Sequence, residues 1–435
     1  MRLTFPITTV VLCACWSLFG QDAMFRGNAQ HSGVYDAVGV PKFGRVKWSF
    51  HTGGMVIGSA TVTGGVVYVG SDDGNFYAID AGSGTQNWKF AVKSRIPSTA
   101  AVLGGTVYFT AYDGNLYALD SASGQLTWKF QTAGERRFAA KHLHGVQPVA
   151  ETMPDPFDCF LSSPLVSNGA VYFGSGDGNV YSVNATSGTL NWKFKTGDVV
   201  HASPAIADGV LYIGSWDSYF YALDAATGQE RWRFKTGDDP DYHNQVGIQS
   251  SATVADGMVY FGCRDSHLYA LDARTGEKKW AFSGNGSWVI ASPAVKDGKV
   301  YFDTSDTSLV IEADAKTGAV LHSFNLNHWY LYSSPAVAGK MMYVGSTQGK
   351  LVAVDLDGFA PVWTFETDGM KEHGPSYTNA DGSPNQEKIY RSDFYDDMVS
   401  GVDRVMSMGS ILGAPVVAGN EVYFGSADGN IYALM

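Results

Sequence analysis

Tryptophan recurs at a near-constant spacing along the chain. Seven of its 11 tryptophans each close a run of the same plan, and these are Trp48, Trp88, Trp128, Trp192, Trp232, Trp280 and Trp363. The plan is clearest in VYVGSDDGNFYAIDAGSGTQNWKF (67–90) and VYFTAYDGNLYALDSASGQLTWKF (107–130). A repeat of about forty residues that is rich in short alternating strands predicts a fold built by stacking one unit many times.

Each repeat divides into four strands, which we call A to D in chain order. In the first repeat they span 59–63, 66–71, 75–80 and 85–90. In four units, as at Asp73-Gly74, strands B and C are joined by Asp-Gly, a typical tight-hairpin signal, because glycine accepts the positive φ that the turn requires. Strands C and D are joined by an aspartate followed four residues later by glycine, and such an aspartate can bond the turn amides.

Eight such units can be counted, and they begin near Ser59, Ser98, Ser162, Ser203, Ser251, Ser292, Ser334 and Gly413. The last unit supplies only strands A to C before Met435, and residues 47–50 match the missing strand D. An N-terminal strand that completes the C-terminal blade would close a ring and remove its exposed edges. The sequence therefore predicts an all-β fold, a single eight-bladed β-propeller of four-stranded antiparallel blades over 47–435.

The seven repeated tryptophans fall on the outermost strand of this scheme. We expect each of them to pack across to the neighbouring blade and to serve a structural role. One unit has Leu321 where tryptophan is expected. The sequence predicts a weaker joint there.

The first 20 residues differ from the rest. Arg2 precedes an apolar stretch that runs to Phe19, which is typical of a secretory signal peptide. The run Leu12-Cys13-Ala14-Cys15 also resembles a lipoprotein processing site, with Cys15 as the acylated residue. We expect an exported, periplasmic protein, either soluble or tethered to the outer membrane through Cys15, with a lead-in over 21–46.

Charge and cysteine content exclude several classes of function. Lys and Arg number 30 against 42 Asp and Glu, a net charge of −12, so nucleic acid is an unfavourable partner. No apolar run beyond the N-terminus is long enough to span a bilayer. Cys159 and Cys263 remain after processing, and we expect inert buried thiols, although a disulfide between them stays open.

The motif YALDAxTGxxxW, quoted from Tyr221 to Trp232, resembles the PQQ-enzyme repeat. That repeat builds the propellers of quinoprotein alcohol dehydrogenases and of the outer-membrane assembly factor BamB. The resemblance covers about 25–435 and implies the propeller fold. It implies PQQ with Ca²⁺ if the chain follows the dehydrogenases, and no cofactor if it follows the assembly factor. The chain lacks the adjacent cysteine pair of the dehydrogenases.

Residues that break the repeat gather in three insertions, which span 131–161, 238–250 and 366–410. All three join strand D to the next strand A, so we expect them on one face of the ring. Eight of the ten histidines map to that face: His51, His142, His144, His201, His243, His267, His328 and His373. Because loops on a rigid scaffold carry function, this face is the predicted binding site.

Several side chains on this face are candidates for chemistry. A PQQ site needs an aromatic platform, for which Trp216, Trp288 and Trp329 are candidates, and cationic clamps, for which Arg136, Arg137 and Arg391 are candidates. Asp393, Asp397 or His144 could serve as the base for substrate oxidation. His142 and His144 would lie on one side of a strand as half of a metal site. Asp393, Asp396 and Asp397 could ligate Ca²⁺, although they lack the usual Ca²⁺-loop order.

Two functions remain open from the sequence. The first is a non-catalytic binding or assembly scaffold of the cell envelope, monomeric, that binds a protein partner or a small molecule through its long-loop face. The alternative is a divergent PQQ-dependent alcohol or sugar dehydrogenase.

Overall fold

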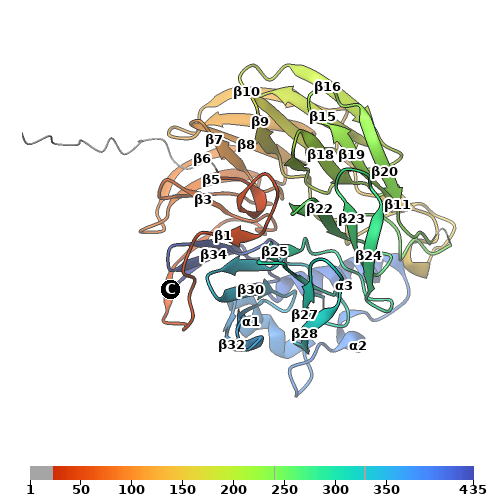
Figure 1. Ribbon diagram of the computed structural model, residues 1–435. Helices are drawn as coiled ribbons and strands as arrows, with labels where there is room; N and C mark the ends of the chain where they lie inside the picture. Colours follow the sequence, from red (N-terminus) through yellow and green to blue (C-terminus); the bar gives the residue numbers. More distant parts are fainter. Residues whose placement is uncertain (1–22, 240, 328–329) are drawn as a thin grey trace, which may run out of the picture.

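The computed structural model describes residues 23–239, 241–327 and 330–435 as a ring of small sheets (Figure 1). The predicted signal peptide with Cys15 therefore lies outside the described residues, as do His328 and Trp329. Eight blades of four antiparallel strands form the ring, and one of them gains a fifth, parallel strand from the N-terminal lead-in. The chain is an eight-bladed β-propeller, as the repeat predicts.

The first blade consists of β3 (Thr61–Thr63), β4 (Val66–Gly70), β5 (Asn75–Asp80) and β6 (Gln86–Ala91). The second to fourth blades follow the same order, with β7 (Ala101–Leu103), β8 (Thr106–Ala111), β9 (Asn115–Asp120), β10 (Leu126–Gln131), β13 (Leu165–Ser167), β14 (Ala170–Gly174), β15 (Asn179–Asn184), β16 (Leu190–Lys195), β17 (Ala205–Ala207), β18 (Val210–Gly214), β19 (Tyr219–Asp224) and β20 (Glu230–Lys235). The fifth to eighth contain β21 (Thr253–Ala255), β22 (Met258–Gly262), β23 (His267–Asp272), β24 (Lys278–Ser283), β25 (Ala294–Lys296), β26 (Lys299–Asp303), β27 (Leu309–Asp314), β28 (Val320–Asn325), β29 (Ala336–Ala338), β30 (Met341–Gly345), β31 (Lys350–Asp355), β32 (Ala360–Glu366), β33 (Val416–Ala418), β34 (Glu421–Gly425) and β35 (Asn430–Leu434).

The ring is closed by the two ends of the chain. Strand β2 (Val46–His51) pairs antiparallel with β35, with Trp48 opposite Ala433. The N-terminal strand thus supplies the outermost position of the eighth blade. Strand β2 therefore covers β35, which would otherwise be an exposed edge strand able to pair with another chain.

Blade position decides which residues are buried. The inner strands are covered by the neighbouring blades, and β5, for example, buries four consecutive residues from Phe76 to Ile79. The outermost strands alternate between exposed and half-buried residues, as in β6. The core therefore consists of layers between successive blades, as in the cluster that joins Phe220 to Phe261 with ring centroids 4.0 Å apart.

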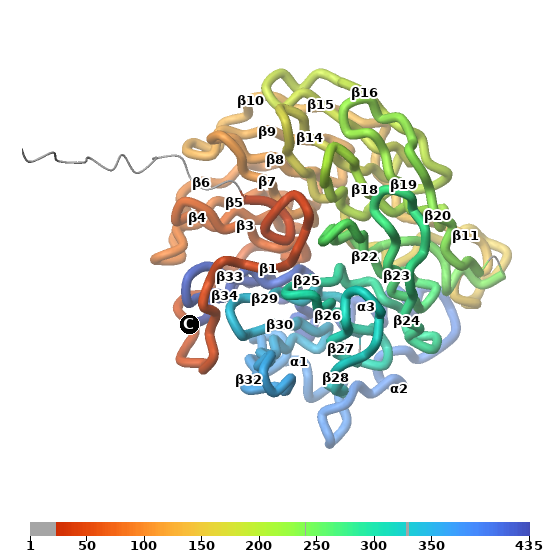
Figure 2. Tube along the Cα trace, in the orientation of Figure 1, coloured from red at the N-terminus to blue at the C-terminus, as the bar shows by residue number. Residues whose placement is uncertain are grey.

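The lead-in crosses the centre of the ring on the face opposite the insertions (red in Figure 2). It contains η1 (Phe25–Gly27) and β1 (Val34–Tyr35), and β1 pairs in parallel with β29. Arg26 is buried there and donates hydrogen bonds to the carbonyls of Pro335 (2.7 Å) and Pro293 (2.6 Å). Burial lowers the pKa of Arg26 to about 10. The lead-in thereby seals one end of the central channel.

Six of the seven repeated tryptophans bond the next blade, as expected, whereas Trp363 donates to the carbonyl of Val40 in the lead-in at 2.8 Å. The Nε1 of Trp192 donates to the carbonyl of Ala225 in the next blade at 3.0 Å. The same indole lies over Gly228, where an added Cβ would come within 2.6 Å of the ring. The glycine that follows each repeated aspartate is therefore required by the tryptophan as well as by its positive φ of 74°.

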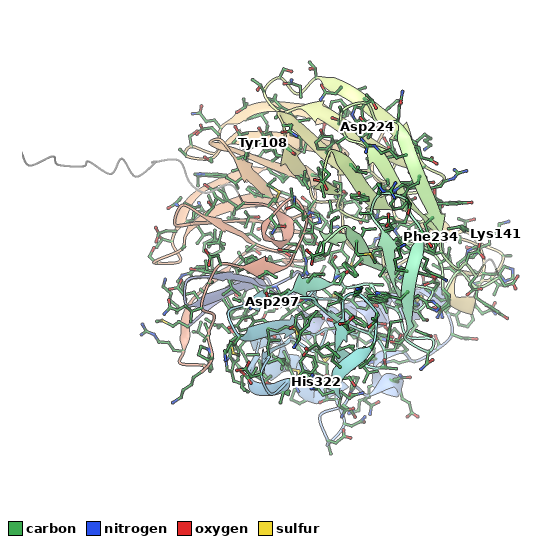
Figure 3. The ribbon with its side chains drawn as sticks, in the orientation of Figure 1. Tyr108, Lys141, Asp224, Phe234, Asp297 and His322 are labelled. Carbon is green, nitrogen blue, oxygen red and sulfur yellow. The ribbon has the colours of Figure 1, made fainter. Side chains whose placement is uncertain are left out.

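The joint without tryptophan differs from the predicted one. Register places His322, not Leu321, at the tryptophan position, because His322 lies opposite Glu312 as Trp280 lies opposite Ala270. Leu321 is exposed on the outer strand. In the next blade Phe359 replaces the glycine and packs on the His322 imidazole, with ring centroids 5.7 Å apart (His322 is labelled in Figure 3). The imidazole, which is smaller than an indole, is thus compensated by a phenyl ring where the other units have glycine.

The insertions add the remaining elements. The first contains β11 (Ala139–Ala140), η2 (Leu143–Gly145) and β12 (Met153–Pro154). The third folds into α1 (Asp368–Tyr377), α2 (Gln386–Ile389) and α3 (Tyr395–Ser407). Among the described residues no helix has both the length and the apolar character needed to cross a bilayer.

Candidate functional site

The three insertions join into one surface, which we call the cap (131–161, 238–250 and 366–410). Gln147 of the first insertion forms backbone hydrogen bonds with the third insertion, through Asp393 (2.8 Å) and Tyr395 (2.8 Å). The backbone N–H of His144 donates to the carbonyl of Tyr242 in the second insertion at 2.6 Å. Segments separated by up to 250 positions in sequence therefore form a continuous cap over one end of the channel.

Three buried carboxylates fasten the first insertion to the propeller. Glu135 accepts hydrogen bonds from Ser175 Oγ (2.8 Å) and from the Gly176 amide (2.6 Å). Asp155 and Asp158 are completely buried and reach the fifth and fourth blades. Because a buried carboxylate without donors is costly, these contacts fix the position of the insertion.

Asp155 pairs with Arg264, whose guanidinium lies between two tryptophan rings. Its Nη1 lies 2.6 Å from Asp155 Oδ2, and its Cζ lies 4.5 Å from the Trp216 ring centroid and 4.0 Å from that of Trp288. Phe138 stacks on the other side of Trp216 at 4.7 Å. Burial alone would raise the pKa of Asp155, but Arg264 and His144 hold it below its usual range. The channel mouth is thus filled by a layered stack of the protein's own side chains.

Asp158 pairs with His201, which is also buried. His201 Nδ1 lies 2.6 Å from Asp158 Oδ1, and its Nε2 lies 3.4 Å from Glu135 Oε2. The second distance is a charge contact rather than an aligned hydrogen bond. Burial alone would lower the pKa of His201, but the two carboxylates raise it to about 10. His201 is therefore a charged imidazolium at neutral pH, which suits an anchoring role and not a general base.

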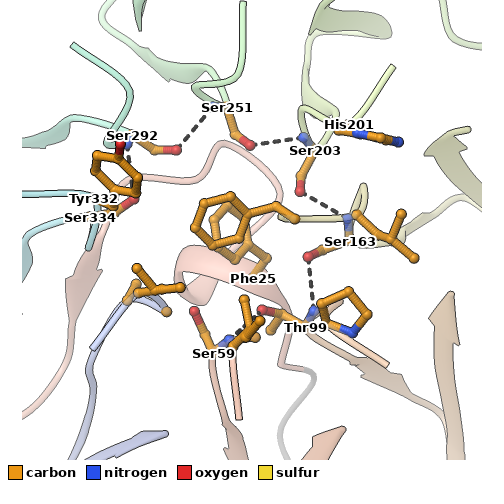
Figure 4. A pocket seen from close by; sticks show the side chains of 18 of the residues that line it. Phe25, Ser59, Thr99, Ser163, His201, Ser203, Ser251, Ser292, Tyr332 and Ser334 are labelled. Atoms are coloured by element: carbon orange, nitrogen blue, oxygen red, sulfur yellow. Dashed lines mark hydrogen bonds between the residues drawn. The ribbon is translucent and has the colours of Figure 1, made fainter. Parts of the chain in front are cut away.

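Below this layer lies a small cavity of about 50 Å³. A belt of hydroxyls surrounds it, in which the backbone N–H of each member bonds the hydroxyl of the next, and its members are Ser59, Thr99, Ser163, Ser203, Ser251, Ser292 and Ser334 (Figure 4). Phe25 of the lead-in lies inside the belt (Figure 4). The channel is consequently closed by the lead-in at one end and by the cap at the other.

An open pocket lies in the cap itself, and we call it the cap pocket. Its volume is about 390 Å³, and it is lined by His144, Val146, Phe157, Asn244, Gly286, Trp288, Asp306, Tyr330, Tyr390, Ser392 and Met398. All three insertions contribute to it. Its volume lies in the range of sites for small ligands or for side chains of a partner.

Asp306 is the one carboxylate among the residues that line the cap pocket. It is exposed to the pocket and accepts a hydrogen bond from Ser305 Oγ at 2.9 Å. The surrounding protein desolvates the carboxylate and raises its pKa, while Ser305 opposes the shift. Among the described residues no basic side chain pairs with it within 4.0 Å.

The residues predicted to bind PQQ are not brought together as a platform and clamp. Trp216 and Trp288 face one another across Arg264, and Trp329 lies outside the described residues. Arg136 is exposed and pairs with Asp198 at 2.7 Å. The other two arginines lie apart from this stack: Arg137 is half-buried near Tyr112 and Asp158, and Arg391 is exposed and directs Nε to the Lys388 carbonyl at 3.4 Å.

The gap between Trp216 and Trp288 does not fit a planar quinone, because the Arg264 guanidinium occupies it. Arg264 cannot move out at low cost, since Asp155 would then be a buried carboxylate without its main cation. Among the described residues there is also no group of three His, Cys, Asp or Glu side chains suited to a metal ion. The described residues therefore do not fit PQQ with Ca²⁺ at the channel mouth.

The predicted bases have other contacts. Asp397 accepts hydrogen bonds from the backbone amides of Arg391 (2.5 Å) and Ser392 (2.9 Å) and from Arg404 (3.0 Å), so it joins the segment before α3 to the helix. Burial opposes these contacts, but together they lower the pKa of Asp397. Asp393 and Asp396 are exposed, and Asp393 contributes its carbonyl to the cap. None of the three reaches into the cap pocket.

The two candidate metal-ligating histidines do not lie on a strand as predicted. Both have left-handed backbone conformations around η2, with φ of 56° at His142 and 52° at His144. The reversal of the backbone separates the two side chains. His142 is exposed, whereas His144 bonds Asp155 (3.1 Å) and Asn244 (3.0 Å).

Arg264, Asp306 and the three anchoring carboxylates were not predicted from the sequence. One signal could have found Arg264. In six units the position just before the turn aspartate varies: Asp72, Tyr112, Gly176, Trp216, Arg264 and Ala427. Glu135, Asp155 and Asp158 carry no such mark, since their partners are set by the fold of an irregular insertion.

The two free cysteines are Cys159 in the cap and Cys263 in the fifth blade, and both are buried. No disulfide joins them. Burial raises the pKa of Cys159 to about 12 and that of Cys263 well above its usual value. Both thiols are protonated at neutral pH and unsuited to nucleophilic chemistry.

Comparisons with known proteins place the chain among the PQQ-like propellers. The family model described as outer membrane protein assembly factor BamB matches residues 37–153, 158–283 and 243–435. No curated protein matches the chain. Among solved structures, BamB from Moraxella catarrhalis is 17% identical with a TM-score of 0.63, covering 90% of this chain and 97% of that one.

Dehydrogenases share the same architecture. A europium-containing methanol dehydrogenase is 16% identical with a TM-score of 0.68, covering 94% of this chain and 90% of its own. Quinohemoprotein alcohol dehydrogenase from Comamonas testosteroni is 14% identical with a TM-score of 0.67, covering 95% and 80%. Identities this low show a common fold alone. The family-model match spans most of the chain, and the chain therefore belongs to the family described as outer membrane protein assembly factor BamB.

Proposed function

We propose that this protein is a non-catalytic binding scaffold of the cell envelope and that its cap binds a partner protein. The observation that carries the proposal is the construction of the cap. Three insertions form one continuous surface with an open pocket, while the channel beneath is filled by the Arg264 stack and closed by Phe25. A scaffold uses such a surface directly, whereas the dehydrogenases of this fold need space in the channel for a cofactor.

The rim of the cap carries exposed aromatic side chains that suit a protein interface. Tyr242 is 58% exposed and Phe394 is 57% exposed. Both flank the same segment of the first insertion. The Tyr242 carbonyl accepts a hydrogen bond from the His144 amide, and Phe394 forms a β-bridge with Gln147. Aromatic residues are enriched at protein interfaces because they bury large areas at a small cost in entropy.

The family supports a place in the envelope. Its description names an outer membrane assembly factor, and the apolar N-terminal stretch is typical of an export signal. The proposal therefore includes export to the periplasm, with Cys15 as a possible point of lipid attachment.

Site-specific photocrosslinking in intact cells tests the proposal. A photoreactive phenylalanine at Tyr242 or at Phe394 is expected to give a discrete protein adduct. The matched control is Val38, which is 75% exposed and lies in the lead-in, away from the cap. Adducts of equal yield from all three positions, or none from the cap positions, would contradict a partner site on the cap. Deleting 131–161 is a poorer test, because Asp155 and Asp158 would be lost from the core.

The dehydrogenase alternative makes the opposite prediction. The purified protein would have to bind PQQ in the presence of Ca²⁺ and oxidise an alcohol or a sugar with a dye as acceptor. We expect no saturable PQQ binding, because Arg264 fills the only gap between the predicted platform residues that the structure describes. Stoichiometric PQQ binding that depends on Trp216 would overturn the scaffold proposal.

A further inference from the structure

We propose that the cap pocket binds an organic cation, a guanidinium or ammonium group carried on a flat or apolar body. The inference rests on the proposed function, in that the pocket lies on the face assigned to the partner. It goes further by naming the chemistry that the face recognises. Asp306 and the aromatic walls around it carry the argument.

The walls of the cap pocket are largely aromatic. Phe157, Trp288, Tyr330 and Tyr390 all line it. Phe157 meets Trp288 at 5.6 Å and Tyr330 at 6.0 Å, both edge to face. Aromatic rings present a negative potential at their faces, so a pocket walled by them favours a cation over an anion. The protein already uses this interaction nearby, where Trp288 holds the Arg264 guanidinium at 4.0 Å.

Asp306 supplies the counter-charge. Its carboxylate is open to the pocket and accepts a hydrogen bond from Ser305 Oγ at 2.9 Å. The positive charge of Arg264 also acts on it, although that guanidinium is paired with Asp155. Desolvation raises its pKa, which means that the ionised form lacks the favourable contacts it would have in water. A bound cation would supply them. A bound carboxylate would instead be repelled.

The other charges around the pocket do not cancel this preference. Arg264 is paired with Asp155 behind the pocket wall, and the His144 ring bonds the same carboxylate. Arg391, next to the lining residue Ser392, is exposed and turns its Nε towards the Lys388 carbonyl. Tyr330 and Tyr390 keep their protons at neutral pH, since burial raises the pKa of both. Asp306 therefore sets the sign of the field inside the pocket.

The size of the pocket defines the rest of the ligand. A volume of about 390 Å³ exceeds what a guanidinium or ammonium group alone would fill. The remainder is lined by Val146, Phe157 and Met398, which favours an apolar or planar body attached to the cation. An arginine side chain of a partner and a free aryl or alkyl amine share this chemistry.

Calorimetric titration with benzamidinium tests the inference, with benzamide as the neutral probe of the same shape. We expect saturable binding of benzamidinium and at least about tenfold weaker binding of benzamide, since a charge-assisted contact is lost. Asp306→Asn keeps the side-chain volume and should weaken benzamidinium by about tenfold or more. Asp393→Asn removes the same charge from an exposed rim position and should leave the affinity within about twofold.

Equal affinity for the two probes, no binding of either, or an unchanged affinity in Asp306→Asn would overturn the inference. An unfolding midpoint of the variant equal to that of the parent protein excludes a misfolded pocket as the cause of lost binding. The source of the cation is distinguished by comparing free agmatine with a capped Gly-Arg-Gly peptide. Tighter binding of the peptide assigns a partner side chain, and tighter binding of agmatine assigns a small molecule.

These results separate the inference from the proposed function. Photocrosslinks at Tyr242 with unaltered probe binding in Asp306→Asn would retain the partner site and overturn the cation pocket. Charge-dependent probe binding without any cap crosslink would retain the pocket and overturn the protein partner.

Discussion

Arg264 shows how a single side chain joins the cap to the propeller. It comes from a turn of the fifth blade, yet its partners are Asp155 in the first insertion and the rings of Trp216 and Trp288. All four residues are buried. A buried ion pair adds little stability compared with an apolar replacement of both partners, but removal of one partner leaves a charge that nothing compensates.

Removing this cation should therefore destabilise the protein strongly. We expect Arg264→Met to cost about 3–5 kcal/mol, because Asp155 then stays buried without its guanidinium partner. Arg136→Met is the matched control, since Arg136 pairs with Asp198 at the surface, and it should cost about 0–1 kcal/mol. Urea unfolding measures both. Equal effects in the two variants would mean that Arg264 contributes no more than a surface arginine.

His201 should make stability depend on pH. Its pKa is raised from 6.5 to about 10 by Asp158 and Glu135 against the effect of burial. The native state then binds the proton more tightly than the unfolded state does. This contribution is complete below about pH 6.5 and is lost as pH rises towards 10.

Urea unfolding between pH 6.5 and 10 checks this. Stability should fall with pH more steeply in the parent protein than in His201→Gln, which cannot carry the proton. Other groups that titrate in this range contribute equally to both proteins, so the difference in slope isolates His201. Parallel slopes would show that the imidazole is not charged in the native state.

Among elements, the joint between successive blades follows a rule of complementary size. A tryptophan on one outer strand covers a glycine in the next blade at six joints. At a seventh joint Trp363 bonds Val40 of the lead-in. The eighth pairs His322 with Phe359, which is 5% exposed and adopts a left-handed φ of 44°. Beside it Glu312 is buried and paired with Lys299. At this joint the smaller ring, His322, lies on the outer strand and a large side chain, Phe359, takes the place of the turn glycine, so the two together fill the joint.

A double-mutant cycle tests this rule. His322→Trp alone should overpack the joint at about 1–3 kcal/mol. Phe359→Gly alone should leave a cavity at about 3–5 kcal/mol. Together they restore the pattern of the other joints, so the double variant should be more stable than the sum predicts by about 1 kcal/mol or more. Additive costs would indicate that the two side chains do not form a single packing unit.

At the scale of the whole molecule, the channel is closed from both sides and the two buried thiols report on separate parts. Cys159 lies in the cap, and Cys263 lies in the fifth blade. Both are inaccessible in the native structure. Their accessibility can therefore distinguish opening of the cap from unfolding of the ring.

We expect a protein that starts at residue 23 to show no fast-reacting thiol under native conditions and two after denaturation in guanidinium chloride. Because the carboxylates of the first insertion are locked into the propeller, both thiols should become reactive in one transition. Mass spectrometry of alkylated peptides identifies each cysteine. Labelling of Cys159 at a denaturant concentration that leaves Cys263 protected would show that the cap opens independently.

The repeat made the propeller predictable to the level of single strands. Strand β2 could be assigned to the eighth blade because the last unit stops after Leu434 while Lys47 and Trp48 match the missing strand. The position of the exception was wrong by one residue. The repeat itself points to His322, which lies four residues after Gly318 as Trp280 lies four residues after Gly276.

The site was predicted only as a region. The sequence predicted that the three insertions share one face, and in the structure they join into the cap. The export signal and the binding role of that face stay predictions. The roles of the individual side chains did not follow from the sequence. Trp216 and Trp288 were predicted as a cofactor platform. Instead, the guanidinium of Arg264, 48 residues beyond Trp216, occupies the gap between their rings.

The tryptophan repeat by itself determined the ring, the number of blades and the way the ring closes, because each of these depends on contacts that recur at a fixed spacing. The tertiary structure decided what the non-repeating residues do. Asp155 and Asp158 pair with residues far away in sequence, and the surroundings of Asp306 are formed by distant segments. Buried charge is governed by the nearest group in space, and nothing in an irregular insertion fixes that neighbour in advance.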